Sequence, residues 1–205
     1  MTEKLISAFI TLFVVIDPAG LGPIFIGLTK GLPAAVKNKI GREAGVIAFF
    51  VLAGSALFGD ALLEKLGISL SAFRIAGGLL LFAIAFEMVF ERRIERKADQ
   101  TGSSGGAASI AAFPLAIPLM AGPGAITAMV LLAGSMNGDW RGLTLLMVIL
   151  AIILASCVLL FRLSSQLERL LGLRGQTVLG RLLGVLLAAL AVQYVADGIL
   201  ALSGR

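Results

Sequence analysis

The chain opens with an apolar run that is long enough to cross a lipid bilayer but is interrupted at its centre. The run extends from Leu5 to Leu28, and about 20 residues suffice to span the hydrocarbon. The residues that interrupt it are Asp17, Pro18, Gly20, Gly22 and Pro23. Because proline lacks an amide donor and clashes with the preceding turn, we expect a broken helix here. A broken span is tolerated in a membrane only where protein or a wet cavity satisfies its backbone.

Composition places the whole chain in the membrane class. Of its 205 residues, 59% are hydrophobic and 14% are charged, which excludes an ordinary soluble domain. There is no histidine and one cysteine, and we find no carboxylate cluster, so we expect no metal site, no cofactor and no enzyme activity. The net charge of +5 does not indicate nucleic acid binding, because the basic residues collect in loops.

Six apolar spans predict an all-α, polytopic membrane protein. We place them at about 5–29, 44–59, 69–90, 109–135, 142–161 and 176–200. The fourth span contains Pro114, Pro118 and Pro123 and is expected to be broken like the first. The segment 91–108 is charged in its first half and rich in Gly and Ser in its second half, which is typical of a flexible linker.

Lysine and arginine are divided unevenly between the two sides of these spans. Of the 17 basic residues, twelve lie in or beside the loops that follow the first, third and fifth spans. They are Lys30, Lys37, Lys39, Arg42, Arg92, Arg93, Arg96, Lys97, Arg162, Arg169, Arg174 and Arg181. Because cytoplasmic loops carry such an excess, we expect a cytoplasmic (inner) membrane location with 91–108 inside and both termini outside.

The two halves of the chain resemble each other. Gly122-Pro123 repeats the proline break of the first span, and Arg181 with Gly184 repeats the pattern of Arg74 with Gly77 at nearly the same offset. Three spans per half is an odd number, so the halves must cross the membrane in opposite senses, as in many secondary transporters. We therefore expect one transmembrane domain, 1–205, built from inverted repeats at 1–90 and 109–205 around the linker.

The two breaks are the expected substrate-binding site. Half-helix N-termini carry partial positive charge and unpaired amides, which suits the carboxylate of a small ligand. The candidate residues are Asp17, Pro18, Gly20, Gly22, Pro23, Gly122, Pro123, Gly124 and Thr127. Asp17 either caps the second half-helix or contacts substrate or a proton, and the two roles can coexist. The glycines either admit a ligand to the main chain or permit close helix packing.

Several residues outside the breaks are weaker candidates. Glu87, Gln193 and Pro118 are expected to stand behind the site, with Gln193 forming a hydrogen bond between helices and Glu87 also explicable as an interface residue. Arg74 and Arg181 are interpreted as anchors whose charged ends reach the membrane surface.

Three motifs together resemble the MarC family of membrane proteins. They are Asp17-Pro18-Ala19-Gly20, Arg74-Ile75-Ala76-Gly77-Gly78, and Pro118 through Gly122-Pro123-Gly124 to Thr127. The similarity covers about residues 5–200. It implies a fold of the LysE-like exporter superfamily and an association with neutral amino acid transport, hence a small zwitterionic substrate such as glycine or alanine. The family name derives from an antibiotic-resistance locus, which does not indicate drug efflux.

We therefore expect a secondary transporter of small neutral amino acids that exports by alternating access at the midplane. A passive channel for small solutes that uses the same half-helices is the first alternative, and a non-transporting membrane scaffold is the second. The expected partners are the substrate and the lipid bilayer, and a homo-oligomer is compatible with the sequence.

Overall fold

The computed structural model describes residues 2–29, 31–90, 110–136 and 138–203. For residues 2, 164–177 and 179 it describes the backbone alone. The described residues form helices joined by short turns. The elements are α1 (Thr2–Ile16), α2 (Pro18–Leu28), α3 (Ala34–Lys65), α4 (Leu70–Val89), η1 (Ala111–Met120), α7 (Pro123–Ser135) and α8 (Trp140–Leu202). By length and composition five helices can cross a membrane, and η1 with α7 forms a sixth, bent span. The predicted polytopic all-α fold is confirmed, while the linker 91–108 lies outside the described residues.

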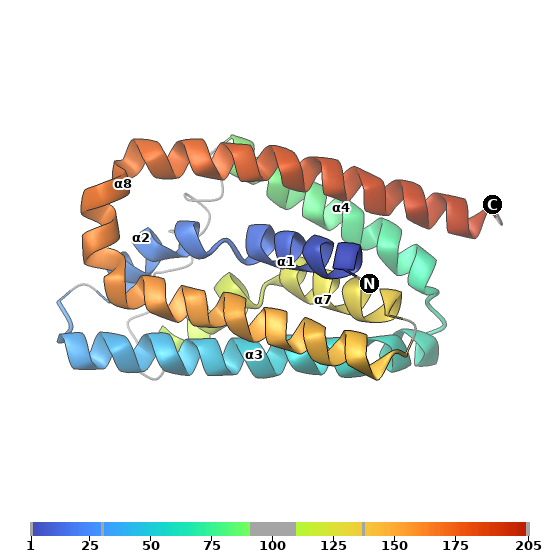
Figure 1. Cartoon of the computed structure of the whole chain (residues 1–205), viewed down its shortest axis with the longest axis horizontal. Helices are drawn as coiled ribbons and strands as arrows, with labels where there is room; N and C mark the ends of the chain where they lie inside the picture. Colours follow the sequence, from blue (N-terminus) through green and yellow to red (C-terminus); the bar gives the residue numbers. More distant parts are fainter. Residues whose placement is uncertain (1, 30, 91–109, 137, 204–205) are drawn as a thin grey trace.

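Two predicted spans differ in extent from the helices. The second span, expected at 44–59, is part of a helix that begins at Ala34 and ends at Lys65, because polar turns extend α3 beyond its apolar centre. The fifth and sixth spans are two arms of one continuous helix, where the sequence predicted a loop between them. We call Trp140–Leu163 the first arm of α8 and Gly180–Leu202 its second arm. Figure 1 shows α8 turning between the two arms, which run in opposite directions along the long axis of the molecule.

The broken spans occupy the centre of the molecule (Figure 1). On one side they are covered by α4 with the second arm of α8, and on the other by α3 with the first arm. The most apolar stretch of α1–α2 is 61% buried, compared with 17% for that of the second arm of α8. The interruption of the first span is therefore kept away from lipid by helices that are themselves continuous.

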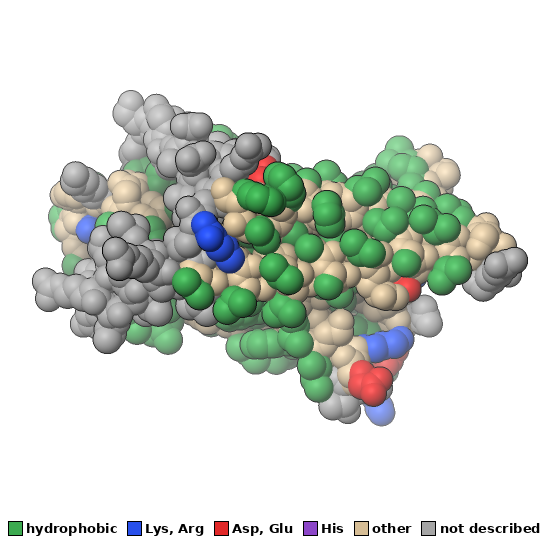
Figure 2. Space-filling model, turned by 90° about the horizontal axis from the view of Figure 1, so that it is seen from above, with side chains coloured by type: hydrophobic (Ala, Val, Ile, Leu, Met, Phe, Trp, Pro, Cys, Tyr) green, Lys and Arg blue, Asp and Glu red, His purple; other side chains and the backbone are tan. Residues whose placement is uncertain are grey.

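The outer surface matches a lipid environment. Large exposed apolar side chains, such as Phe50, Phe58 and Leu182, lie on α3 and α8. Figure 2 shows hydrophobic side chains spread over much of one face, with few charged side chains among them. Stacked Phe25 and Phe161, with ring centroids 4.4 Å apart, join α2 to the first arm inside this shell.

Small residues let α4 and the second arm of α8 pack closely in antiparallel directions. A Cβ placed on Gly78 would lie 2.8 Å from the Ala191 carbonyl oxygen, and one on Gly198 would lie 2.9 Å from that of Ser71. Side chains at these positions would push the backbones apart. Within a membrane, such close approach supplies the packing that the hydrophobic effect cannot, because lipid is as apolar as the helices.

Candidate functional site

The first break is organised by Asp17. Its backbone adopts the left-handed conformation with φ 56°, which ends α1, and Pro18 occupies the first turn of α2. The Asp17 Oδ1 atom accepts a hydrogen bond of 3.1 Å from the Gly20 amide. The side chain is only 7% exposed, so water cannot readily replace this bond. The predicted capping role is confirmed, and a role in binding substrate or a proton stays a prediction.

The second break combines two extended residues in η1 with a helix N-terminus, that of α7, which has no side-chain cap. Phe113 and Ile117 leave the helical region for extended torsions, because each precedes a proline. The chain then passes through Ala121 and Gly122 and starts α7 at Pro123, with a bend of 57° between η1 and α7. In contrast to α2, α7 has no side-chain cap on its first amides. The first four positions of a helix lack intrahelical partners for their amides, and because Pro123 has no N–H, the donors here are the amides of Gly122, Gly124 and Ala125.

The two breaks lie against each other at the centre of the protein. Because the first and fourth spans are antiparallel, α1 packs on α7, and the Lys4 Nζ atom donates a 2.9 Å hydrogen bond to the Ser135 carbonyl oxygen. Farther along, Val15 Cγ1 lies 3.4 Å from the position that a Cβ on Gly124 would take. Both half-helices α2 and α7 run outward from this point, so their N-termini meet there. The two broken spans therefore run in opposite senses, as the sequence predicted.

The four glycines of the predicted site have different surroundings. A Cβ on Gly20 would collide with the Asp17 carboxylate, and one on Gly122 would lie 2.5 Å from the Pro118 carbonyl oxygen. Gly124 faces the Ile84 side chain of α4, which agrees with the packing interpretation. Gly22 alone of the four has nothing among the described residues within 4 Å of the point that a Cβ would occupy. It is thus the position where a ligand has most room to reach the main chain.

The remaining predicted residues are divided between the breaks and the periphery. Thr127 is 4% exposed and its methyl group fills the space left by Gly77 on α4. Pro23 lies inside α2. Glu87 is half-buried on α4. The prediction for Gln193 was wrong, because its amide donates a 2.7 Å hydrogen bond to Asp197 in the same helix, one turn away, instead of joining two helices.

Thr11 was missed by the sequence reasoning. It lies on α1, is completely buried, and its Oγ1 atom makes no hydrogen bond within the described part of the chain. The Tyr194 hydroxyl of α8 approaches it without the geometry of a hydrogen bond. A threonine in an apolar helix gives no sequence signal by itself, since it usually bonds its own helix. Across the described ranges, no three Cys, Asp or Glu side chains come together as a metal site.

Comparisons with known proteins find similar membrane proteins over nearly the whole chain. The sequence model of the MarC family of integral membrane proteins matches residues 2–203. A membrane protein of Archaeoglobus fulgidus is 40% identical over 94% of this chain and 91% of its own length. The membrane protein YvbG of Bacillus subtilis is 33% identical over 97% and 95%, and YhcE of Escherichia coli is 37% identical over 93% and 89%. No solved structure matches the chain.

Proposed function

Because this chain belongs to the MarC family of integral membrane proteins, we propose that it is a secondary transporter of small neutral amino acids and that its two broken spans form the substrate site. The observation that supports this most directly is the meeting of two half-helix N-termini in the buried centre of the molecule. Transporters commonly place their substrate at such a junction of discontinuous helices.

The two breaks offer complementary chemistry for a zwitterion. The uncapped first turn of α7, beginning at Pro123, presents amides and the positive end of a helix dipole to a carboxylate. Asp17, already capping α2, supplies negative charge for the ammonium group of the same substrate. Open space at Gly22 and the walls of buried apolar residues favour a ligand with a side chain as short as that of glycine or alanine.

The source of energy follows from the sequence. No phosphate-binding loop of the form GxxxxGK[ST] occurs in the 205 residues, so we propose that an ion or substrate gradient drives transport. We propose export across the cytoplasmic membrane by alternating access. The inverted relation of the two broken spans supports this cycle, because it gives the protein two related halves that can exchange roles.

Counterflow in proteoliposomes tests the proposal. Vesicles that contain purified protein and are loaded with unlabelled L-alanine should accumulate labelled alanine transiently, whereas a passive channel would show no accumulation above equilibrium. Thermal unfolding in each of the twenty amino acids should also identify the substrate. A ligand at ten times its Kd stabilises the folded state by about 1.4 kcal/mol. Absence of both counterflow and stabilisation would contradict the proposal.

A matched pair of aspartates isolates the role of charge at the first break. Asp17→Asn keeps a carbonyl oxygen that can accept from the Gly20 amide, so folding should be preserved while transport falls. Asp139 also caps a helix, with a 3.0 Å bond from the Arg141 amide, but is exposed at the surface. Asp139→Asn should leave transport unchanged. Equal transport by the two variants would remove the Asp17 charge from the mechanism.

A further inference from the structure

A polar cavity of about 320 Å³ lies at the end of the molecule that carries both chain termini. It is formed by the start of α1, the start of α4, the end of α7 and the end of α8, and seven of its nine lining residues are polar. A water molecule takes roughly 30 Å³ of liquid volume, so the cavity can hold a small amino acid together with several waters. We call it the terminal vestibule.

The vestibule contains charges of both signs, and no ion pair joins them in the described part of the chain. Its cations are Arg74 and Lys4, and its carboxylates are Glu3 and Asp197. Lys4 donates to the Ser135 carbonyl oxygen and Asp197 accepts from Gln193, while in the described part of the chain Arg74 forms no ion pair. Arg74 is partly buried. A guanidinium in this setting is suited to bind a carboxylate through two parallel hydrogen bonds.

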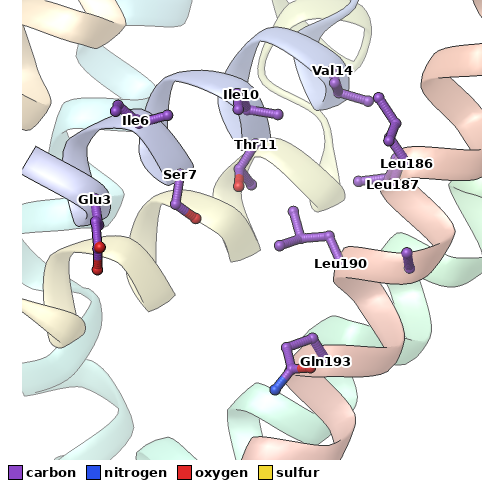
Figure 3. A pocket seen from close by; sticks show the side chains of 11 residues that line it. Glu3, Ile6, Ser7, Ile10, Thr11, Val14, Leu186, Leu187, Leu190 and Gln193 are labelled. Carbon is purple, nitrogen blue, oxygen red and sulfur yellow. The ribbon is translucent and has the colours of Figure 1, made fainter.

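A row of polar side chains on α1 leads from the vestibule toward the breaks. Glu3, Ser7 and Thr11 are spaced four residues apart and therefore share one face of the helix. Figure 3 shows their side chains on the same side of α1, in the wall of an adjoining cavity of about 510 Å³ that shares Glu3 and Ser7 with the vestibule. One turn beyond Thr11, Val15 contacts the start of α7 near Gly124.

The opposite wall follows the same course. Leu131 of α7 lines the vestibule, and its Cδ1 atom lies 3.3 Å from the point that a Cβ on Gly77 would occupy. Gly77 lies on α4, one turn deeper into the molecule than Arg74. The next residue of α7 on this face is Thr127, whose methyl group also meets Gly77. Both walls thus connect the vestibule to the second break, and each carries one buried hydroxyl residue, Thr11 or Thr127, on the way.

We propose that the terminal vestibule is a second substrate site, where a small zwitterion binds with its carboxylate on Arg74 and its ammonium group on Asp197 before or after it occupies the central breaks. The inference rests on the proposed transport function and deepens it. The hydroxyl of Thr11, which has no hydrogen bond among the described residues, gives the passing ligand a polar partner between the two sites. In this proposal Arg74 binds substrate, in addition to any role as an anchor at the membrane surface.

Two fragments of alanine test whether Arg74 binds the carboxylate and Asp197 binds the ammonium group. Propionate keeps the carboxylate alone and ethylamine keeps the ammonium group alone. In the wild-type protein both should inhibit alanine counterflow. In Arg74→Gln the alanine concentration for half-maximal counterflow should rise tenfold or more, and propionate inhibition should weaken to what the central site alone provides. Asp197→Asn should instead weaken inhibition by ethylamine and leave inhibition by propionate unchanged. Arg141→Gln, which alters an exposed arginine stacked on Trp140 at the first turn of α8, is the matched control and should behave as wild type.

A second readout remains usable if Arg74→Gln fails to fold. The native Cys157 is the sole cysteine and is buried, so a Ser7→Cys variant reacts with a charged thiol reagent mainly at the vestibule. L-alanine should slow this modification at least threefold. Unchanged propionate inhibition in Arg74→Gln, or no protection of the cysteine at position 7, overturns the proposal that substrate binds in the vestibule. Alanine counterflow by the wild-type protein would still support the central site.

The two proposals fail separately. Should wild type show no alanine counterflow, the transport function falls, and equilibrium dialysis of labelled alanine against the purified protein then decides the vestibule. Binding that is lost in Arg74→Gln and kept in Arg141→Gln supports it, and no binding to wild type overturns it as well.

Discussion

Replacing Asp17 by three different residues should separate the hydrogen bond of this cap from its backbone conformation. Asparagine retains both the acceptor for the Gly20 amide and a tolerance for φ 56°. Glycine accepts the conformation but loses the acceptor, and an amide left unsatisfied at a site that is 7% exposed costs about 1–3 kcal/mol. Alanine loses the acceptor and also pays about 1–2 kcal/mol for a left-handed backbone. The expected order of stability is therefore aspartate and asparagine, then glycine, then alanine.

Cys157 provides the assay for this series. It is the one cysteine of the chain and is fully buried on the first arm of α8, so a thiol-reactive dye reports unfolding during heating. For a chain of this length 1 kcal/mol corresponds to about 2–4 °C in Tm. The glycine variant should unfold several degrees below wild type, and the alanine variant several degrees lower again. If the alanine and asparagine variants unfolded together, neither the cap nor the left-handed turn at Asp17 would stabilise the fold.

Three further predictions concern small residues and one buried hydroxyl. Gly122→Ala should destabilise the protein by about 1–3 kcal/mol, since its Cβ meets the Pro118 carbonyl. Gly22→Ala has no described atom near its Cβ, so it should keep its Tm in the dye assay and lower alanine counterflow. Equal Tm values for the two variants would refute the packing argument. Gly78→Ala should lower Tm because it separates α4 from the second arm of α8. Gly180→Ala lies on that second arm, where no atom of the described residues is within 4 Å of the Cβ position, and it should match or exceed wild type. Thr11→Val should raise stability by about 1–3 kcal/mol, because it removes a buried hydroxyl that has no hydrogen bond among the described residues. A lower Tm would show that this hydroxyl is satisfied in the folded protein.

The breaks could be predicted from the sequence because their causes are local. Pro18 and Pro123 each lack an amide donor, and Asp17 directly before proline is a favourable cap, so no knowledge of the packing was needed. Their opposite orientation followed from counting spans between them. The extended residues Phe113 and Ile117 could have been predicted by the same rule, since each precedes a proline.

Features that depend on packing were missed. Hydropathy marked only the lipid-facing part of α3, so its polar first turns, with an ion pair of 3.8 Å between Lys39 and Glu43, were assigned to a loop. Arg74 lies near the end of its span and reads from sequence alone as an anchor. Only the folded chain brings it to a cavity with Glu3 and Asp197, which lie far from it in the sequence. Gln193 was paired wrongly for the same reason.

The unbroken course of α8 has a mechanical consequence. Trp140–Leu202 carries the chain from one flank of the molecule to the other without leaving the helical conformation. Loop or terminal residues normally absorb the large torsional changes of a hinge, and along this stretch there are none. Any rocking of the two flanks must therefore bend α8 itself. A helix that is bent when the flanks move apart resists that movement, so α8 would favour their return.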